Sequence, residues 1–211
     1  MRITVFGATG GVGRELVRQA VAAGHEVTAV VRDASRLPAP LSGARVCAMA
    51  RLDDPEALRE AVEGRDVVLS GLGSRGRKAD GVAERLTGSV LAAMEAAGTR
   101  RLVVVSAAPV GPRPADDPLP DRLARKVVGA VLKEIYADLT RMEAELARSA
   151  TDWTSVRPPK LTDGPLTGTY RTVVGGFPRS GRTISRADVA HAMLALAGDP
   201  AAVKQGVGVA Y

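Results

Sequence analysis

The sequence contains few of the residues on which disulfide-bonded and metal-binding proteins depend. Its 211 residues include one cysteine, two histidines and 3% aromatic residues. The single cysteine, Cys47, cannot form an internal disulfide, which is typical of the reducing cytoplasm, and we expect it to pack as a small hydrophobe. Neither His25 nor His191 has a partner at metal-ligand spacing, so no metal site is predicted.

Long apolar runs and processing signals are also missing. No run approaches ~18 consecutive apolar residues, so we expect no membrane span. The chain enters its first strand-like segment almost at once, and we therefore expect no signal peptide and a cytoplasmic protein. The net charge is +6, but the 29 Lys and Arg are scattered. Without a basic arm, an aromatic-interleaved patch or a DNA-reading motif, this charge indicates an anionic cofactor or substrate and no nucleic acid.

Glycine, in contrast, is abundant, and Gly7, Gly10 and Gly13 follow a β-branched and aromatic run at residues 3–6. Apolar residues then recur at helical spacing over 12–21. A strand, a glycine turn and a helix together cradle a diphosphate on backbone N–H groups and the helix dipole. No Gly-Lys-Ser/Thr follows, which argues against a Walker-type loop. The alternative is a purely structural glycine turn.

Strand-like and helix-like segments alternate along the rest of the chain. This rhythm predicts an α/β fold of Rossmann type, with a doubly wound parallel sheet. We expect one domain, residues 1–211, in which 1–157 form the dinucleotide-binding core and 158–211 a small C-terminal lobe over the carboxyl edge of the sheet. Strands are expected at 26–32, 44–50, 66–73, 101–108 and 152–158, with short ones near 168–174 and 206–210. Helices are expected at 54–64 and 81–98, along an apolar stripe from Val128 to Leu146, and from Ser185 to Gly198.

In folds of this kind the binding site lies outside the carboxyl ends of the parallel strands. Five such ends carry residues suited to a site. They are the loop Gly7–Gly13, Arg32 with Asp33, Gly71 to Ser74, Ser106 with Ala107, and the turn Pro158-Pro159-Lys160.

Arg32 bears on the choice of nicotinamide cofactor, because NAD sites usually place Asp or Glu at the end of the second strand. A guanidinium there pairs with a 2′-phosphate through charge-assisted bonds, and Arg36 is near enough to help. We therefore predict NADP(H). The alternative is that Arg32 is solvated and Asp33 takes the ribose hydroxyls.

Three stretches carry a family resemblance: FGATGGVGRELVRQAVAAGHEVTAVVRDASRLP, RPPKLTDGPLTGTYR and ISRADVAHAML. Over nearly its whole length the chain resembles atypical short-chain dehydrogenase/reductases, in particular NmrA-like proteins and the flavin reductase (biliverdin reductase B) type. The resemblance implies NADP(H) on the glycine loop, Arg32 at the 2′-phosphate, Ser106 beside the nicotinamide and the Pro158-Pro159 turn along its face. The candidate cofactor-binding residues are Gly7, Thr9, Gly10, Gly11, Val12, Gly13, Arg32, Arg36, Arg51, Leu52, Gly71, Leu72, Gly73, Ser106, Ala107, Pro158, Pro159 and Lys160.

The chain departs from that family at three places. Ala50-Arg51 replaces a usual Gly-Asp whose Asp contacts adenine, so this contact is lost or is replaced by Arg51 stacking on the base. Lys160 stands where flavin reductases often have His; it either holds a phosphate or carboxylate of the acceptor, or a cofactor phosphate, or is solvated. The segment from Pro109 to about Ile135 is longer than in flavin reductases.

The Tyr-x-x-x-Lys motif of most short-chain dehydrogenases is absent, because Thr140 follows Tyr136 and Val174 follows Tyr170 at that spacing. Ketone chemistry therefore lacks its usual acid. We predict an NADPH-dependent oxidoreductase, a monomer or small homo-oligomer, with a flat small-molecule acceptor such as a flavin, quinone or bilin. Its catalytic candidates are Ser106, Lys160 and Tyr136, although the apolar stripe favours a packing or lining role for Tyr136. The alternatives are a non-catalytic NADP(H) sensor and a tailoring reductase, dehydratase or epimerase with 109–135 as its lid.

Overall fold

The computed structural model describes residues 1–34, 43–73, 81–112, 129 and 131–211. In this part of the chain, eight strands form a central sheet in the order β3-β2-β1-β4-β5-β6-β10-β8, and only β8 runs antiparallel to its neighbour. The strands are β1 (Arg2–Phe6), β2 (Glu26–Val31), β3 (Ala44–Ala48), β4 (Val67–Ser70), β5 (Arg101–Val105), β6 (Asp152–Arg157), β8 (Arg171–Val174) and β10 (Gln205–Ala210). The predicted Rossmann-type α/β fold is confirmed.

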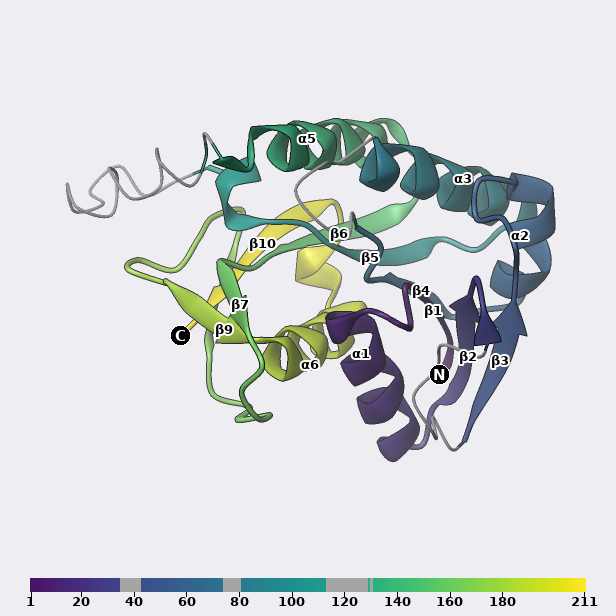
Figure 1. Cartoon of the computed structure of the whole chain (residues 1–211), viewed down its shortest axis with the longest axis horizontal. Coiled ribbons are helices and arrows are strands. Elements are labelled where there is room, and N and C mark those ends of the chain that lie inside the picture. Colours follow the sequence, from purple (N-terminus) through teal and green to yellow (C-terminus); the bar gives the residue numbers. More distant parts are fainter. Residues whose placement is uncertain (35–42, 74–80, 113–128, 130) are drawn as a thin grey trace.

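Helices cover both faces of the sheet, as Figure 1 shows. The helices α1 (Gly11–Ala22) and α6 (Arg186–Ala197) pack side by side on one face. The other face carries α2 (Pro55–Val62), α3 (Val82–Ala97) and α5 (Lys133–Arg148). Each face therefore has its own apolar core, and the inner strands β1, β2, β4 and β5 are buried on both sides, as parallel strands usually are. The edge strands β3 and β8 are more exposed.

Local sequence signals account for most element boundaries. The side chain of Asp54 caps α2 by accepting from the backbone N–H groups of Glu56 and Ala57, at 3.2 and 3.4 Å. Gly98 ends α3 in the left-handed conformation, with φ of +70°. The sheet segments end earlier than the sequence suggested, since β4 ends at Ser70 and β5 at Val105. The residues that follow these two strands leave the sheet at its carboxyl edge. Of the predicted stripe from Val128 to Leu146, Val128 lies outside the described residues.

The region 158–211, which we expected to form a small lobe, is divided between two sheets. Its strand β10 pairs in parallel with β6 and carries β8 at the edge, so both extend the central sheet. Its strands β7 (Lys160–Thr162) and β9 (Thr183–Ser185) form a separate two-stranded parallel sheet. Two short 3₁₀ turns, Ala108–Val110 and Pro200–Ala202, complete the elements of the described chain.

A buried carboxylate holds this C-terminal region together. Asp188 on α6 is fully buried and accepts hydrogen bonds from the Tyr211 hydroxyl at 2.5 Å, from the Gly168 N–H at 2.8 Å and from the Thr167 N–H at 3.0 Å. Burial raises the pKa of Asp188, but these hydrogen bonds outweigh burial and lower the pKa to about 2. The ionised carboxylate thus ties α6 to the segment after β7 and to Tyr211.

The β1–α1 turn depends on the absence of side chains at Gly7 and Gly13. Gly7 has φ of +73°, and a Cβ atom there would lie 2.7 Å from the backbone carbon of Gly71. A Cβ atom at Gly13 would lie 2.1 Å from the carbonyl oxygen of Gly7. Since both obstacles are backbone, they cannot move aside as a flexible side chain would. As predicted, Gly13 lets α1 approach the sheet.

Gly13→Ala is therefore expected to destabilise the protein by about 1–3 kcal/mol, because overpacking forces the backbone apart. Gly88→Ala is a matched control, since a Cβ atom at Gly88, inside α3, would meet no neighbour within 4 Å. This second change should stabilise the protein by up to about 1 kcal/mol through helix propensity. Urea unfolding of both variants measures the two free energies, and similar values would contradict the packing argument.

Candidate functional site

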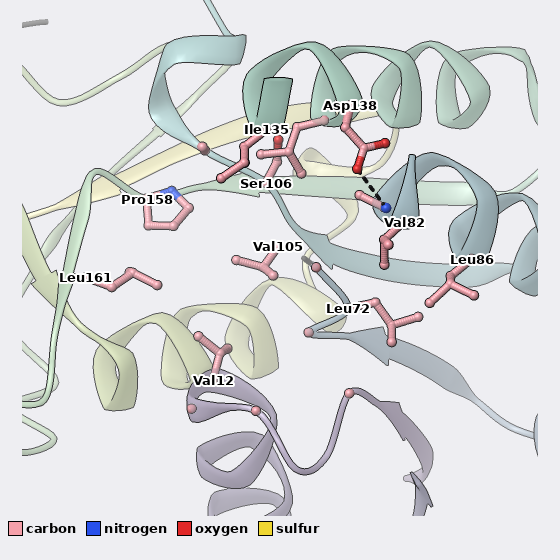
Figure 2. Close-up of a pocket in the computed structure, with 18 of the residues that line it drawn as sticks. Val12, Leu72, Val82, Leu86, Val105, Ser106, Ile135, Asp138, Pro158 and Leu161 are labelled. Atoms are coloured by element: carbon pink, nitrogen blue, oxygen red, sulfur yellow. Dashed lines mark hydrogen bonds between the residues drawn. The ribbon is translucent and has the colours of Figure 1, made fainter. Parts of the chain in front are cut away.

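A cleft of about 870 Å³ opens at the carboxyl ends of β1, β2, β4, β5 and β6. It lies between the ends of α1 and α6 on one side and of α3 and α5 on the other, as Figure 2 shows. Most of the residues predicted from the sequence line it. These are Gly7, Thr9, Gly10, Gly11, Val12, Arg32, Leu52, Gly71, Leu72, Gly73, Ser106, Ala107, Tyr136, Pro158 and Pro159.

Three predicted residues are not among those that line the cleft. Gly13 is buried beneath Gly7, where it serves the packing of α1. Arg51 is largely exposed and pairs with Asp53 at 3.2 Å, while Leu52 lines the cleft in its place. Lys160 begins β7, is exposed and is not among the lining residues. A fourth residue, Arg36, lies outside the described residues.

The glycine loop forms one end of the cleft. The N–H of Gly10 donates to the carbonyl oxygen of Gly7 at 2.8 Å, which closes the turn before α1. Gly10 is the N-cap of α1, and no side chain caps this helix. The first N–H groups of a helix have no acceptor within the helix, and its dipole places positive charge at the N-terminus. This end of the cleft therefore suits an anion. Arg32 adds an exposed guanidinium at the end of β2.

Much of the remaining lining is apolar, and most of these wall residues were not singled out from the sequence. Figure 2 shows side chains converging on the cleft from α3, α5, β5 and β7. The wall residues are Val82, Leu86, Val105, Ile135, Leu139 and Leu161. The apolar stripe of α5 is visible in the sequence, but which of its residues face a cleft and which face the core depends on the neighbouring helices. Apolar walls with a few polar groups are typical of small-molecule sites.

Ser106 is a polar residue of the lining. It follows β5 and is 8% exposed, and its N–H donates to the carbonyl oxygen of Val156 at 2.7 Å. Its hydroxyl oxygen has no hydrogen-bond partner among the described residues. Because buried hydroxyls are nearly always paired, a water molecule or a bound ligand is the expected partner of this one.

Tyr136 also lines the cleft, one turn of α5 before Thr140. The hydroxyl of Thr140 donates to the backbone oxygen of Tyr136 at 2.8 Å. Thr140, which stands where the usual motif has lysine, thus hydrogen-bonds to the backbone of its own helix. It provides no positive charge to the tyrosine.

Asp138 is a buried charge in the lining that sequence analysis missed. It is 2% exposed and accepts from the N–H groups of Ala83 and Glu84 at 2.9 and 3.1 Å, one of which Figure 2 marks. The N-cap of α3, Gly81, has no side-chain cap of its own. Asp138 therefore caps α3 from α5 and joins the two apolar walls. A sequence scan for caps fails here because the carboxylate comes from another helix.

Residues 7–200 match the family of NAD(P)H-binding proteins. The chain belongs to the NAD(P)H-binding family. This agrees with the resemblance seen in the sequence and makes NAD(P)H the cofactor class of the chain. In the described residues no helix is long and apolar enough to cross a membrane, and no group of His, Cys, Asp and Glu could hold a metal ion.

Two curated relatives cover part of the chain. A 3-diazoavenalumate denitrifying reductase of Streptomyces sp. is 37% identical over 135 residues, which are 57% of this chain and 43% of that protein. The photosystem II assembly factor Ycf39 of Synechocystis sp. is 31% identical over 117 residues, 50% of this chain and 33% of that protein. The chain therefore aligns with less than half the length of either relative.

Solved structures share the whole fold. A short-chain dehydrogenase/reductase of Veillonella parvula in complex with NADP has a TM-score of 0.82 at 20% identity, covering 100% of this chain and 94% of that one. The anaerobilin reductase ChuY of Escherichia coli O157:H7 has a TM-score of 0.80 at 23% identity, covering 100% and 97%. At these identities the likeness concerns the fold alone.

Asp138→Ala is expected to lower the free energy of unfolding by about 1–3 kcal/mol, because two N–H groups of α3 lose their acceptor. Asp138→Asn keeps one acceptor oxygen and should lose less. Glu145→Ala, which removes an exposed partner of Arg148 farther along α5, should change stability by less than about 0.5 kcal/mol. Chemical denaturation measures all three variants, and equal losses for Asp138→Ala and Glu145→Ala would refute the capping role.

Proposed function

We propose that the protein is an NADPH-dependent reductase of a flat, conjugated acceptor such as a flavin, quinone or bilin. The observation that carries this proposal is the continuity of the cleft. It combines an anion-binding glycine loop and Arg32 with apolar walls and with the buried hydroxyl of Ser106, which has no partner among the described residues.

The residues of the cleft fit a dinucleotide. A Cβ atom at Gly10 would lie only 3.2 Å from the carbonyl oxygen of Gly7, so the missing side chain leaves the backbone open to a phosphate. The glycine loop and the start of α1 would hold the diphosphate, and Arg32 would hold the 2′-phosphate. Buried Leu52 offers apolar contact to a base, and Ser106 would bond the nicotinamide end.

Bound NADPH supplies the hydride. The protein contributes orientation and exclusion of water, because the walls from α3 and α5 and the turn at Pro158 and Pro159 restrict the acceptor to one plane. Thr140 stands four residues after Tyr136, where the usual motif has the lysine that favours proton donation. Acceptors with an electron-poor conjugated centre suit this site, since solvent can supply their proton. The reductase relative from Streptomyces supports a reductase, although it aligns over only part of its length.

An NADPH-oxidation screen with FMN, riboflavin, quinones and bilins tests the proposal. Turnover with at least one of these acceptors is the expected result. Tight NADPH binding without turnover on any acceptor would instead favour a redox sensor of the NmrA-like type. Turnover confined to a carbonyl or sugar substrate would favour a tailoring enzyme.

The wild type is expected to bind NADPH about tenfold or more tightly than NADH, because the 2′-phosphate gains a charge-assisted contact with Arg32. Arg32→Asp should erase or reverse this preference. Arg51→Ala, which removes an exposed arginine outside the lining, is the matched control and should leave both affinities unchanged. Titration calorimetry measures the dissociation constants, and equal wild-type affinities for the two cofactors would disprove the preference.

Tyr136→Phe is expected to keep turnover within about tenfold of the wild type, because Thr140 replaces the motif lysine and the tyrosine belongs to the apolar stripe of α5 that lines the cleft. Ser106→Ala should cost more in kcat/KM, since the buried hydroxyl has no partner among the described residues and would be available to the bound molecules. Lys160→Ala serves as the control and should leave the KM values for FMN and riboflavin unchanged, because Lys160 is exposed outside the lining. A loss beyond about 100-fold for a folded Tyr136→Phe would instead identify Tyr136 as the acid.

A further inference from the structure

Arg186, the first residue of α6, lies across the glycine loop. A Cβ atom at Gly11 would be only 2.4 Å from Cδ and 2.8 Å from Nε of Arg186. Gly11 is the first residue of α1, and both residues line the cleft. The guanidinium group is therefore held beside the helix N-terminus by the packing of α6 against α1.

The surroundings of Arg186 favour an anion that the protein itself does not fully provide. The first turn of α1 contains no acidic residue, and no side chain caps it. Arg186 pairs with Asp163, at 2.5 Å between Nη1 and Oδ1, just after β7. The side chain of Asp163 is 90% exposed, so this ion pair is largely solvated and contributes little. A better-placed anion in the cleft can replace it.

We propose that Arg186 is a second anchor for the cofactor diphosphate and exchanges Asp163 for phosphate oxygens when a dinucleotide binds. This inference rests on the proposed NADPH-binding role of the cleft. A guanidinium group can donate two parallel N–H bonds to phosphate oxygens, and the dipole of α1 acts on the same anion. The N-terminal loop and the C-terminal region, far apart in the sequence, would then hold one diphosphate together.

Arg32 and Arg186, the arginines of the described lining, would contact different parts of the cofactor. Arg32 would bind the 2′-phosphate, which NADP(H) carries and NAD(H) lacks. Arg186 would bind the diphosphate, which NADP(H) and NAD(H) share. This difference separates their roles experimentally, because 2′-AMP has the 2′-phosphate but lacks the diphosphate.

The test measures dissociation constants of NADPH, NADH and 2′-AMP by titration calorimetry. Arg186→Gln should weaken NADPH and NADH alike by about tenfold and leave 2′-AMP unchanged. Arg32→Gln should weaken NADPH and 2′-AMP and spare NADH. Arg148→Gln removes the same charge from an exposed site at the end of α5 and should change none of the three.

Asp163→Asn is a second variant, for which we expect the opposite change in dinucleotide affinity. Removing the competing carboxylate should increase the affinity for NADPH and NADH about two- to threefold and leave the affinity for 2′-AMP unchanged.

Thermal unfolding verifies that each variant is folded. Unchanged dinucleotide affinity in Arg186→Gln, or an equal loss for 2′-AMP, would overturn the diphosphate contact. No tightening in Asp163→Asn would overturn the exchange. If the wild type binds both dinucleotides but does not oxidise NADPH with any of the acceptors, the proposed reductase function is wrong. The inference about Arg186 would still stand in that case.

Discussion

The backbones of β1, α1 and the segment after β4 touch one another at Gly7, Gly13 and Gly71, with no side chain between them. A Cβ atom at any of these glycines would lie within 3.3 Å of the backbone of another member of the set. This contact brings the N-terminus of α1 to the carboxyl edge of the sheet. A side chain there would push α1 outward and close the space in which a phosphate can approach the backbone.

The position of α1 also determines what the C-terminal region contributes. Because α6 packs beside α1, its first residue, Arg186, comes to the glycine loop. The buried Asp188, two residues later, fastens the same end of α6 to the segment around Thr167 and to Tyr211. Thus one packing contact near the N-terminus and one buried carboxylate near the C-terminus together orient a guanidinium group toward the cleft.

The cleft combines cationic groups with apolar surface. Arg32, Arg186 and the N-terminus of α1 belong to its lining, while the side chains from α3 and α5 are mostly apolar. Asp138 is the buried acid of the lining, and its charge is used within the protein to cap α3. An acceptor between these walls would meet mainly apolar side chains and the hydroxyl of Ser106, which suits a planar ring system and excludes water from it.

Local patterns in the sequence determined the strand–turn–helix at Gly7–Gly13, the alternation of strands and helices, and the placement of Arg32, Ser106 and Pro158 at strand ends. These features follow from backbone geometry and periodicity within one segment, so they can be read without the fold. Only the tertiary structure showed that Asp138 caps α3 and that Arg186 lies beside the glycine loop. It also showed that Arg51 and Lys160 are not among the lining residues. The contacts of Asp138 and Arg186 join helices and loops distant in sequence, and no local pattern specifies which side chain of an exposed or apolar stripe will meet another segment. Packing of the whole core determines where α3, α5, α6 and the glycine loop meet. It therefore also determines which side chains line the cleft and what chemistry they offer.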